Sequence, residues 1–165
     1  MAFPATGMFV QTWIKSLKAA SGFDTPLNLC TNGAFGVYSG CSLYTNSVTT
    51  DLTTNVDDIF TAGQFFSNEI SGAGYATNGY LFPSQTFAHT SGGVVSYTST
   101  TNPNWTGSTL SNVQGCVYWC PTLASTVITY SGIMAYNFGT AVSTVSGTLT
   151  IQLASSTIFT IDLIP

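Results

Sequence analysis

The segment Ser131-Gly132-Ile133-Met134-Ala135-Tyr136-Asn137-Phe138 gives the clearest indication of the fold class. Its β-branched and aromatic side chains are typical of a strand, and similar short runs recur along the chain with turn residues between them. We expect strands at 35–38, 41–45, 80–81, 85–88, 94–99, 116–119 and 131–138, and a closing hairpin of 147–153 and 156–163 that turns at Ala154 and Ser155. Turns at intervals of roughly 8 to 12 residues favour antiparallel pairing. The chain is therefore predicted to be mainly β, an antiparallel, jelly-roll-like β-sandwich.

One α-helix is predicted near the N-terminus, from Met8 to about Ala20. Its apolar residues recur at helical spacing and form one stripe: Phe9, Val10, Trp13, Ile14 and Leu17. A second, shorter helical turn is expected at 56–66, where two aspartates favour a helix N-terminus. We divide the chain into an N-terminal arm with the amphipathic helix, residues 1–24, and a single β-sandwich domain, residues 25–165.

Formal charges are rare in this chain and lie mainly in its first part. It has 2 basic and 6 acidic residues among 165, or 5% charged residues, whereas a soluble domain usually has about 25%. Between residues 70 and 161, His89 is the sole residue that can carry a full charge. So few basic residues exclude a nucleic-acid partner, because phosphate recognition depends on Lys and Arg. A content of 44% hydrophobic residues excludes intrinsic disorder.

The apolar runs are too short for a helical membrane span, which needs about 18 to 20 residues. No basic residues precede the mildly apolar N-terminal segment, so we expect no export signal. We therefore expect synthesis in a reducing cytoplasm and no membrane partner. An outer-membrane barrel is an alternative that the sequence disfavours, because the predicted strands are shorter than the roughly 9 to 11 residues that such a wall needs.

The sequence contains no arrangement of residues typical of an enzyme. His89 is the sole histidine, and no serine lies in a Gly-x-Ser-x-Gly segment, so a Ser-His-Asp triad is not supported. The carboxylates are scattered, and the adjacent Asp57 and Asp58 suit the start of a helical turn better than a glycosidase pair. The segment Gly72-Ala73-Gly74 precedes strand-like sequence, whereas a phosphate loop precedes a helix. We expect no catalytic activity, no catalytic residue and no cofactor.

The four cysteines, Cys30, Cys41, Cys116 and Cys120, raise the question of a metal site. Zinc sites favour two close pairs, and three residues separate Cys116 from Cys120, but ten separate Cys30 from Cys41. The residues between the closer pair suit a buried strand better than a metal-binding turn. Free buried thiols are thus favoured, with a disulfide formed after release from the cell, or zinc, as the alternatives.

Glycine turns and strands follow one another in a specific order between residues 69 and 161. The segments are Glu69-Ile70-Ser71-Gly72-Ala73-Gly74-Tyr75 with Asn78-Gly79, Asn104-Trp105-Thr106-Gly107-Ser108-Thr109, Gly115-Cys116-Val117-Tyr118, Met134-Ala135-Tyr136-Asn137-Phe138-Gly139, and the pair 147–151 and 158–161. They resemble the E-V-x-G-x-G-Y-x-x-G-G, V-T-W-x-x-A-T, G-A-V-I-Y and I-A-Y-x-D-F-G segments and the final hairpin of a family of small virion proteins in tailed bacteriophages. The resemblance covers roughly residues 35–163.

This resemblance implies a structural role in a virion and brings no catalytic residues with it. The implied roles are a head-decoration or minor head protein, or a component of the tail or its fibres. The chain has Asn102, Asn104 and Asn137 where the family tends to have acidic residues. Contacts that depend on those charges are therefore not expected here.

Two functional hypotheses follow from the resemblance and from the low charge. A surface with few charges loses little free energy when it is desolvated in an assembly. The first is a capsid decoration or cement protein in a virion assembled in the bacterial host cytoplasm, with the major capsid protein and copies of itself as partners. Phe9, Trp13 and Leu17 are its candidate assembly contacts, although they could instead cover one end of the sandwich. The second is a tail or fibre component that binds a host glycan through Tyr and Trp side chains.

Overall fold

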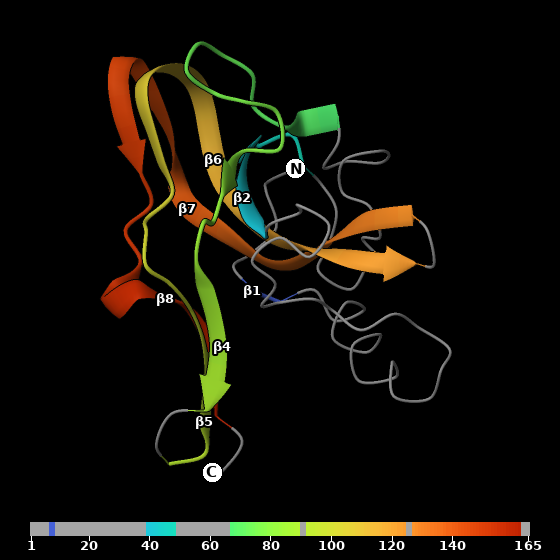
Figure 1. Cartoon of the computed structure of the whole chain (residues 1–165). Helices are drawn as coiled ribbons and strands as arrows, with labels where there is room; N and C mark the ends of the chain where they lie inside the picture. Colours follow the sequence, from blue (N-terminus) through green and yellow to red (C-terminus); the bar gives the residue numbers. More distant parts are fainter. Residues whose placement is uncertain (1–6, 9–38, 49–66, 90–91, 125–126, 163–165) are drawn as a thin grey trace.

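A computed structural model describes residues 7–8, 39–48, 67–89, 92–124 and 127–162 (Figure 1). Eight β-strands account for most of these residues. They are β1 (Gly7–Met8), β2 (Gly40–Thr45), β3 (Tyr80–Leu81), β4 (Gln85–His89), β5 (Val94–Ser99), β6 (Asn104–Ala124), β7 (Val127–Thr150) and β8 (Thr157–Asp162). A 3₁₀ turn, η3 (Ala154–Ser156), precedes β8. The prediction of a mainly β chain is confirmed.

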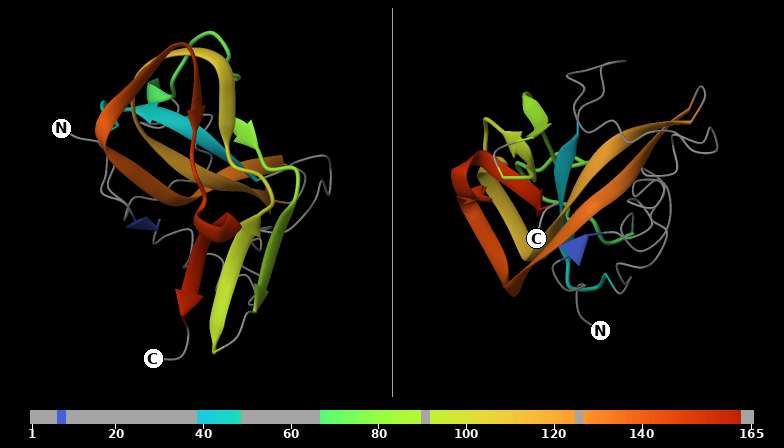
Figure 2. Two further views of the ribbon diagram at one scale, coloured as in Figure 1. Left: turned by 90° about the vertical axis from the view of Figure 1, so that its left-hand side faces the viewer. Right: turned by 90° about the horizontal axis from the view of Figure 1, so that it is seen from below.

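The strands form two antiparallel sheets. The larger has five strands in the order β1-β7-β6-β2-β3, and the smaller has three in the order β4-β5-β8. Strands β6 and β7 form one long curved ribbon, and the left panel of Figure 2 shows the three-stranded sheet below the arch of that ribbon. Their lengths of 21 and 24 residues exceed the short strands predicted at 116–119 and 131–138, which are only their central parts.

The predicted closing hairpin is wrong. The end of β7 pairs with the start of β6, with Leu149 opposite Trp105, and β8 pairs instead with β5, with Phe159 opposite Tyr97. The chain passes from one sheet to the other through η3, where Ser155 has a φ of 50°. Two hydrogen bonds hold this crossover: Ile151 N donates to the Pro103 carbonyl at 2.9 Å, and Leu153 N donates to Asn102 Oδ1 at 3.0 Å.

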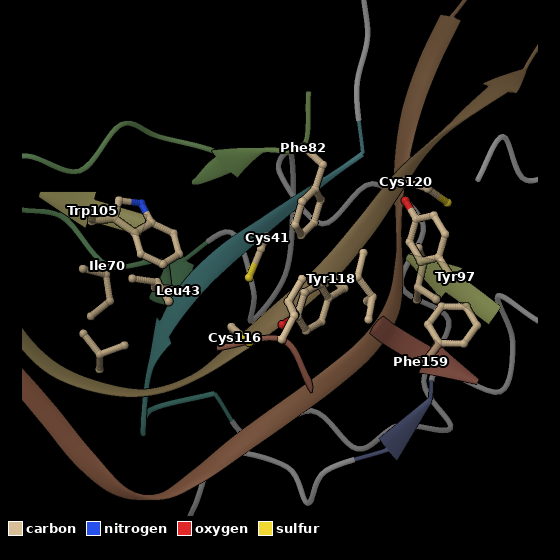
Figure 3. Close-up of a cluster of buried hydrophobic side chains, with 14 of the residues drawn as sticks. Cys41, Leu43, Ile70, Phe82, Tyr97, Trp105, Cys116, Tyr118, Cys120 and Phe159 are labelled. Carbon is tan, nitrogen blue, oxygen red and sulfur yellow. The ribbon is translucent and has the colours of Figure 1, made fainter. Parts of the chain in front are cut away.

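One hydrophobic core contains residues of both sheets (Figure 3). Phe82 stacks on Tyr118 with ring centroids 6.1 Å apart, and Tyr97 of β5 meets Phe159 of β8 at 5.4 Å. The opposite face of the five-stranded sheet is also buried, since Trp119 is only 1% exposed. This burial on both faces explains why 116–120 is a continuous apolar run rather than an alternating one.

The other predictions of local structure have mixed outcomes. The strands expected at 41–45, 80–81, 85–88 and 94–99 are confirmed, with differences of at most one residue at an end. Met8, where the helix was expected to begin, belongs instead to β1 and lies opposite Met134 of β7. The rest of that helix, the helical turn at 56–66, the strand at 35–38 and the boundary after residue 24 lie outside the described residues. Within the described ranges, no helical segment has the length and apolar character of a membrane span.

Candidate functional site

Residues 69–79, here called the Glu69 loop, form a closed hydrogen-bonded unit. The Oε1 atom of Glu69 accepts hydrogen bonds from the Tyr75 hydroxyl at 2.7 Å and from Asn78 N at 2.8 Å. The Tyr75 hydroxyl also accepts a hydrogen bond from Leu43 N of β2 at 3.0 Å. The carboxylate therefore joins the two ends of the loop and, through Tyr75, attaches them to the five-stranded sheet.

Three glycines let the Glu69 loop approach the sheet closely. Gly74 and Gly79 both have a φ of 76°, in the left-handed region that favours glycine. A Cβ atom on Gly79 would overlap the Cys41 carbonyl oxygen, and one on Gly72 would overlap the Thr109 carbonyl oxygen. The glycines that suggested a virion family at the sequence level thus have a packing role in this chain.

The two side chains that close the loop have pKa values displaced from their ordinary values. Burial raises the pKa of Glu69, although the hydrogen bonds from Tyr75 and Asn78 oppose that shift. Burial, and then the nearby Glu69, raise the pKa of Tyr75 far above its ordinary value. Because the same Oε1 atom accepts both hydrogen bonds that close the loop, we assign Glu69 a structural role.

Three of the four cysteines lie in the core as free thiols. Cys41 of β2 and Cys116 of β6 lie on the same face of the sheet, because Cys41 faces Tyr118 and Cys116 faces Leu43 across the strand pair. Burial raises the pKa of the Cys41 and Cys120 thiols, and a hydrogen bond with Cys116 raises that of Cys41 further. The raised pKa favours the protonated form of the Cys41 and Cys120 thiols, which is a poor nucleophile and a poor metal ligand.

The proposed metal alternative gains no support from the described part of the chain. Cys30 lies outside the described residues. Among the residues that are described, no group of three His, Cys, Asp or Glu side chains could hold a metal ion. His89 lies exposed at the end of β4, opposite Val95.

An apolar groove with a volume of about 590 Å³ opens beside β7. One wall comes from Met134, Tyr136 and Phe138, which alternate along β7. The other comes from the end of β7, the crossover and the start of β8, with Leu149, Ile151 and Ile158. No residue that lines it carries a formal charge. The groove extends the core to the surface, since Met134, Phe138, Leu149 and Ile151 are partly buried against the core cluster.

Strand β7 exposes several large hydrophobic side chains, and two of them, Tyr136 and Val142, line the groove. Four large hydrophobic side chains are exposed in the described part of the chain, and three of them belong to β7: Tyr136 at 46%, Val142 at 37% and Val145 at 84% exposed. Tyr136 and Phe138 form a tilted ring pair with centroids 6.0 Å apart. An uncharged groove with exposed apolar residues at its rim is suited to bind a neutral, largely apolar partner.

The groove was not predicted from the sequence. The alternation of Met134, Tyr136 and Phe138 within an expected strand does place three large side chains on one face. The opposite wall depends on the crossover to the second sheet, which replaced the expected hairpin. The assembly contacts predicted from the sequence, Phe9, Trp13 and Leu17, lie outside the described residues.

Comparisons of the chain with protein-family models, curated proteins and solved structures found no match.

Proposed function

We propose that this chain is a structural protein of a tailed-bacteriophage virion, a decoration or cement protein that binds the outer shell and bridges capsid subunits. The observation that carries the proposal is the distribution of charge. Of the 8 charged residues in the chain, Glu69 and Asp162 are the two in the described ranges, and Glu69 is engaged within its own loop. The described surface therefore consists almost entirely of uncharged polar and apolar groups.

Such a surface is suited to permanent contacts. Uncharged hydroxyl and amide groups lose less on desolvation than ions do, and aromatic side chains provide anchors. A monomer exposing this surface would have little electrostatic repulsion from its own copies. The partners that we propose are the major capsid protein and further copies of the chain.

The resemblance to virion proteins is the second support for the proposal, and it includes the Glu69 loop. That loop carries the E-x-x-G-x-G-Y pattern, and its glutamate, tyrosine and glycines hold a loop against a sheet. We also propose that the two sheets stack as a jelly-roll-like sandwich, because a single core cluster includes side chains from both. No catalytic role is part of this proposal.

Cryo-electron microscopy of the intact virion tests the main proposal. Density for this chain on the outer shell at contacts between capsid subunits would support it, and a bare shell with the chain on the tail would contradict the decoration role. Particles that lack the chain should release DNA at a lower temperature than complete particles, because a ligand that binds only the intact shell stabilises it.

The second candidate, a tail or fibre component that binds a host glycan, is favoured by one feature. Tyr136, which is half exposed, lines an uncharged groove whose lining also includes Thr150 and Gln152. An exposed tyrosine ring with neutral polar neighbours is a surface on which a sugar ring can stack. Specific retention of the purified chain on an array of host glycans would favour this role over decoration.

A further inference from the structure

We infer that Asn78-Gly79, inside the Glu69 loop, is a site of asparagine deamidation that the closed loop protects and that opening of the loop exposes. Asparagine reacts most readily in this way where glycine follows it, because glycine has no side chain to hinder attack by its nitrogen. Among the asparagines in the described ranges, Asn78 is the one that glycine follows. The inference concerns this loop alone and does not depend on a role in a virion.

The reaction uses atoms of the chain and water. The backbone nitrogen of Gly79 loses its proton to the solvent and bonds to the side-chain carbonyl carbon of Asn78, whose nitrogen takes a proton and leaves as ammonia. Water then opens the resulting succinimide at either carbonyl group, which gives aspartate or isoaspartate at position 78. Asn78 and Gly79 are both partly exposed, so water can reach them.

Both polar groups of the peptide bond between Asn78 and Gly79 are engaged in the folded chain. Gly79 N donates to the Ala76 carbonyl at 2.9 Å, so the reacting nitrogen holds its proton in a hydrogen bond that points away from the Asn78 side chain. The Asn78 carbonyl accepts from Ser42 Oγ at 2.8 Å, which fixes the other side of the same peptide. Ring closure requires this peptide to rotate until its nitrogen faces the side chain, and that rotation breaks both hydrogen bonds.

Packing against β2 leaves the peptide no room to rotate in place. A Cβ atom on Gly79 would overlap a carbonyl oxygen of β2, so the backbone already lies in direct contact with that strand. Ser42 Oγ also accepts from Trp119 Nε1 at 2.9 Å, which connects it to the buried part of the sheet. Asn78 N donates to Glu69 Oε1 at 2.8 Å. Deamidation therefore requires the loop to separate from the sheet, which is a local opening of the fold.

The turn itself explains why an asparagine lies at this position. Asn78 has a φ of 74° and is the third residue of the turn that the hydrogen bond between Gly79 and Ala76 closes. Asparagine and glycine adopt such a φ more readily than other residues do. The turn thus favours a residue type that is chemically reactive before glycine, and the hydrogen bonds of the closed loop limit its reaction.

The products do not fit the closed loop. Aspartate at position 78 would place a second carboxylate near Glu69, whose Oε1 atom is 2.8 Å from the nitrogen of that residue, and like charges repel. Isoaspartate adds a methylene group to the main chain, so the contacts with Ser42 and Ala76 no longer match in spacing. A chain whose loop has opened and reacted therefore keeps a permanently weakened loop.

The test measures deamidation at Asn78 in the purified full chain held at mildly alkaline pH. Chymotrypsin cleaves after Tyr75 and Tyr80, and mass spectrometry of the peptide 76–80 gives the fraction of aspartate and isoaspartate over time. A synthetic peptide of residues 73–83 gives the rate without the fold. We expect the native chain to react more slowly than this peptide by about 10-fold or more, because the reactive arrangement is reached only through local opening.

Two variants that weaken the loop should accelerate the reaction in the full chain. Glu69→Ala removes the acceptor of Asn78 N, and Tyr75→Phe removes a hydroxyl donor to the same carboxylate while keeping the ring and the cleavage site. Each should raise the rate by about 5-fold or more, since loss of a buried hydrogen bond increases the population of the open loop. Tyr97→Phe is the matched control, because it also removes a hydroxyl hydrogen bond, at 2.8 Å to Gln85 Oε1, but in the other sheet. It should leave the rate at the native level.

Four results would overturn the inference. They are a synthetic peptide that does not react, a native chain that reacts as fast as the peptide, folded loop variants that react no faster than the native chain, and equal acceleration by Tyr97→Phe. Circular dichroism shows whether each variant is folded, and Tyr75→Phe decides if Glu69→Ala is not. None of these measurements depends on where the chain lies in a virion, so this inference and the proposed function can fail separately.

Discussion

The two halves of the β6–β7 ribbon differ in how they are built. In the inner half, residues 115–120 pair with 131–137, and every side chain from Cys116 to Cys120 is buried. In the outer half, 104–113 pairs with 142–150, and buried residues alternate irregularly with exposed ones. Four of the five register shifts of the strand pair fall between Trp105 and Gly115, and the fifth lies between Tyr118 and Trp119. In β6, the inner half is buried throughout, whereas the outer half contributes Trp105, Leu110 and Val113 to the core and exposes most of the residues between them.

Side-chain hydroxyls support the backbone where the outer half departs from a regular ladder. Thr144 Oγ1 accepts a hydrogen bond from Leu110 N at 3.1 Å and forms another with Ser108 Oγ at 3.0 Å. Ser143 Oγ accepts from Asn112 N, and Thr109 Oγ1 accepts from Ser146 N, each at 3.0 Å. The abundant Ser and Thr side chains of the outer half therefore have a structural role in addition to making its surface hydrophilic. They accept hydrogen bonds from the backbone N–H groups of Leu110, Asn112 and Ser146, which the bulged ladder does not pair with carbonyl groups.

Removing the largest buried side chain of the inner half should give the largest effect. Trp119→Ala is expected to lower the free energy of unfolding by about 3 to 5 kcal/mol, because it leaves a cavity and removes the 2.9 Å hydrogen bond from Trp119 Nε1 to Ser42 Oγ. Urea unfolding followed by circular dichroism measures this change. Tyr136→Ala, at the exposed rim, is the comparison and should cost less than half as much. If both variants lost the same unfolding free energy, the difference in burial between Trp119 and Tyr136 would be contradicted.

Alanine substitutions at two glycines with positive φ angles can distinguish the cost of close packing from the cost of backbone conformation. Gly79→Ala should destabilise the fold by about 2 to 4 kcal/mol, since its φ of 76° is strained for alanine and its Cβ atom would overlap the Cys41 carbonyl. Gly107 in the outer half has a φ of 61° but no atom within 4 Å of a Cβ position. Gly107→Ala should therefore cost only about 1 kcal/mol. Thermal unfolding of both variants tests the difference, and a Gly107 variant as unstable as the Gly79 variant would refute it.

The Glu69 loop packs against β2 and against the outer half of β6, and we expect its carboxylate to have an intermediate effect on stability. Glu69→Ala leaves the Asn78 amide and the Tyr75 hydroxyl without their acceptor and is expected to cost about 1 to 3 kcal/mol. Glu69→Gln keeps an acceptor oxygen and removes the buried charge, so at neutral pH it should be as stable as the native chain or more stable. Urea midpoints at pH 7.5 distinguish these outcomes, and equal losses in both variants would show that the charge itself is required.

The raised pKa of Glu69 also predicts a pH dependence. The folded chain binds this proton more tightly than the unfolded chain, whose Glu69 titrates near the ordinary value of 4.5. The resulting stabilisation is complete below that value and is lost as the pH rises through the higher pKa of the folded state. A plot of unfolding free energy against pH should therefore fall less steeply above pH 4.5 in Glu69→Gln than in the native chain. Identical slopes in the two proteins would contradict a raised pKa of Glu69 in the folded state.

The smallest effect is expected for a single hydroxyl in the outer half. Thr144→Val removes the acceptor of Leu110 N and the contact with Ser108, at a cost of about 1 kcal/mol. Thr148→Val, at an exposed position of the same half, should change stability by less than about 0.5 kcal/mol. Thermal unfolding of the two variants measures the difference. If Thr148→Val were the more damaging, the hydroxyl contacts would not be what supports the bulges.

Local sequence predicted most strands but not their full lengths. The segment 94–99 is bounded by glycine and polar turn residues, and its limits as a strand were predicted to the residue. The outer half of β6 was not, because its serines, asparagine and glycine have low strand propensity. Its extended conformation depends on hydroxyl contacts with β7, which are 31 to 37 residues distant in the chain. The groove was not predicted because its second wall forms only where the chain crosses from β7 to β8 in the other sheet, a connection that the sequence did not indicate.

Three properties of this chain can be deduced from its amino-acid order alone: it is mainly β, its charges are few and lie mostly in the first part, and 116–120 is apolar on both faces. These properties depend on composition and on residues close together in the chain. Three others require the folded structure: β8 leaves β7 for the other sheet, the glycines at 72, 74 and 79 serve to pack a loop, and β7 borders a groove. Each of these depends on contacts between distant residues, because Ile158 and Phe159 reach the common core only in the second sheet, beside Tyr97.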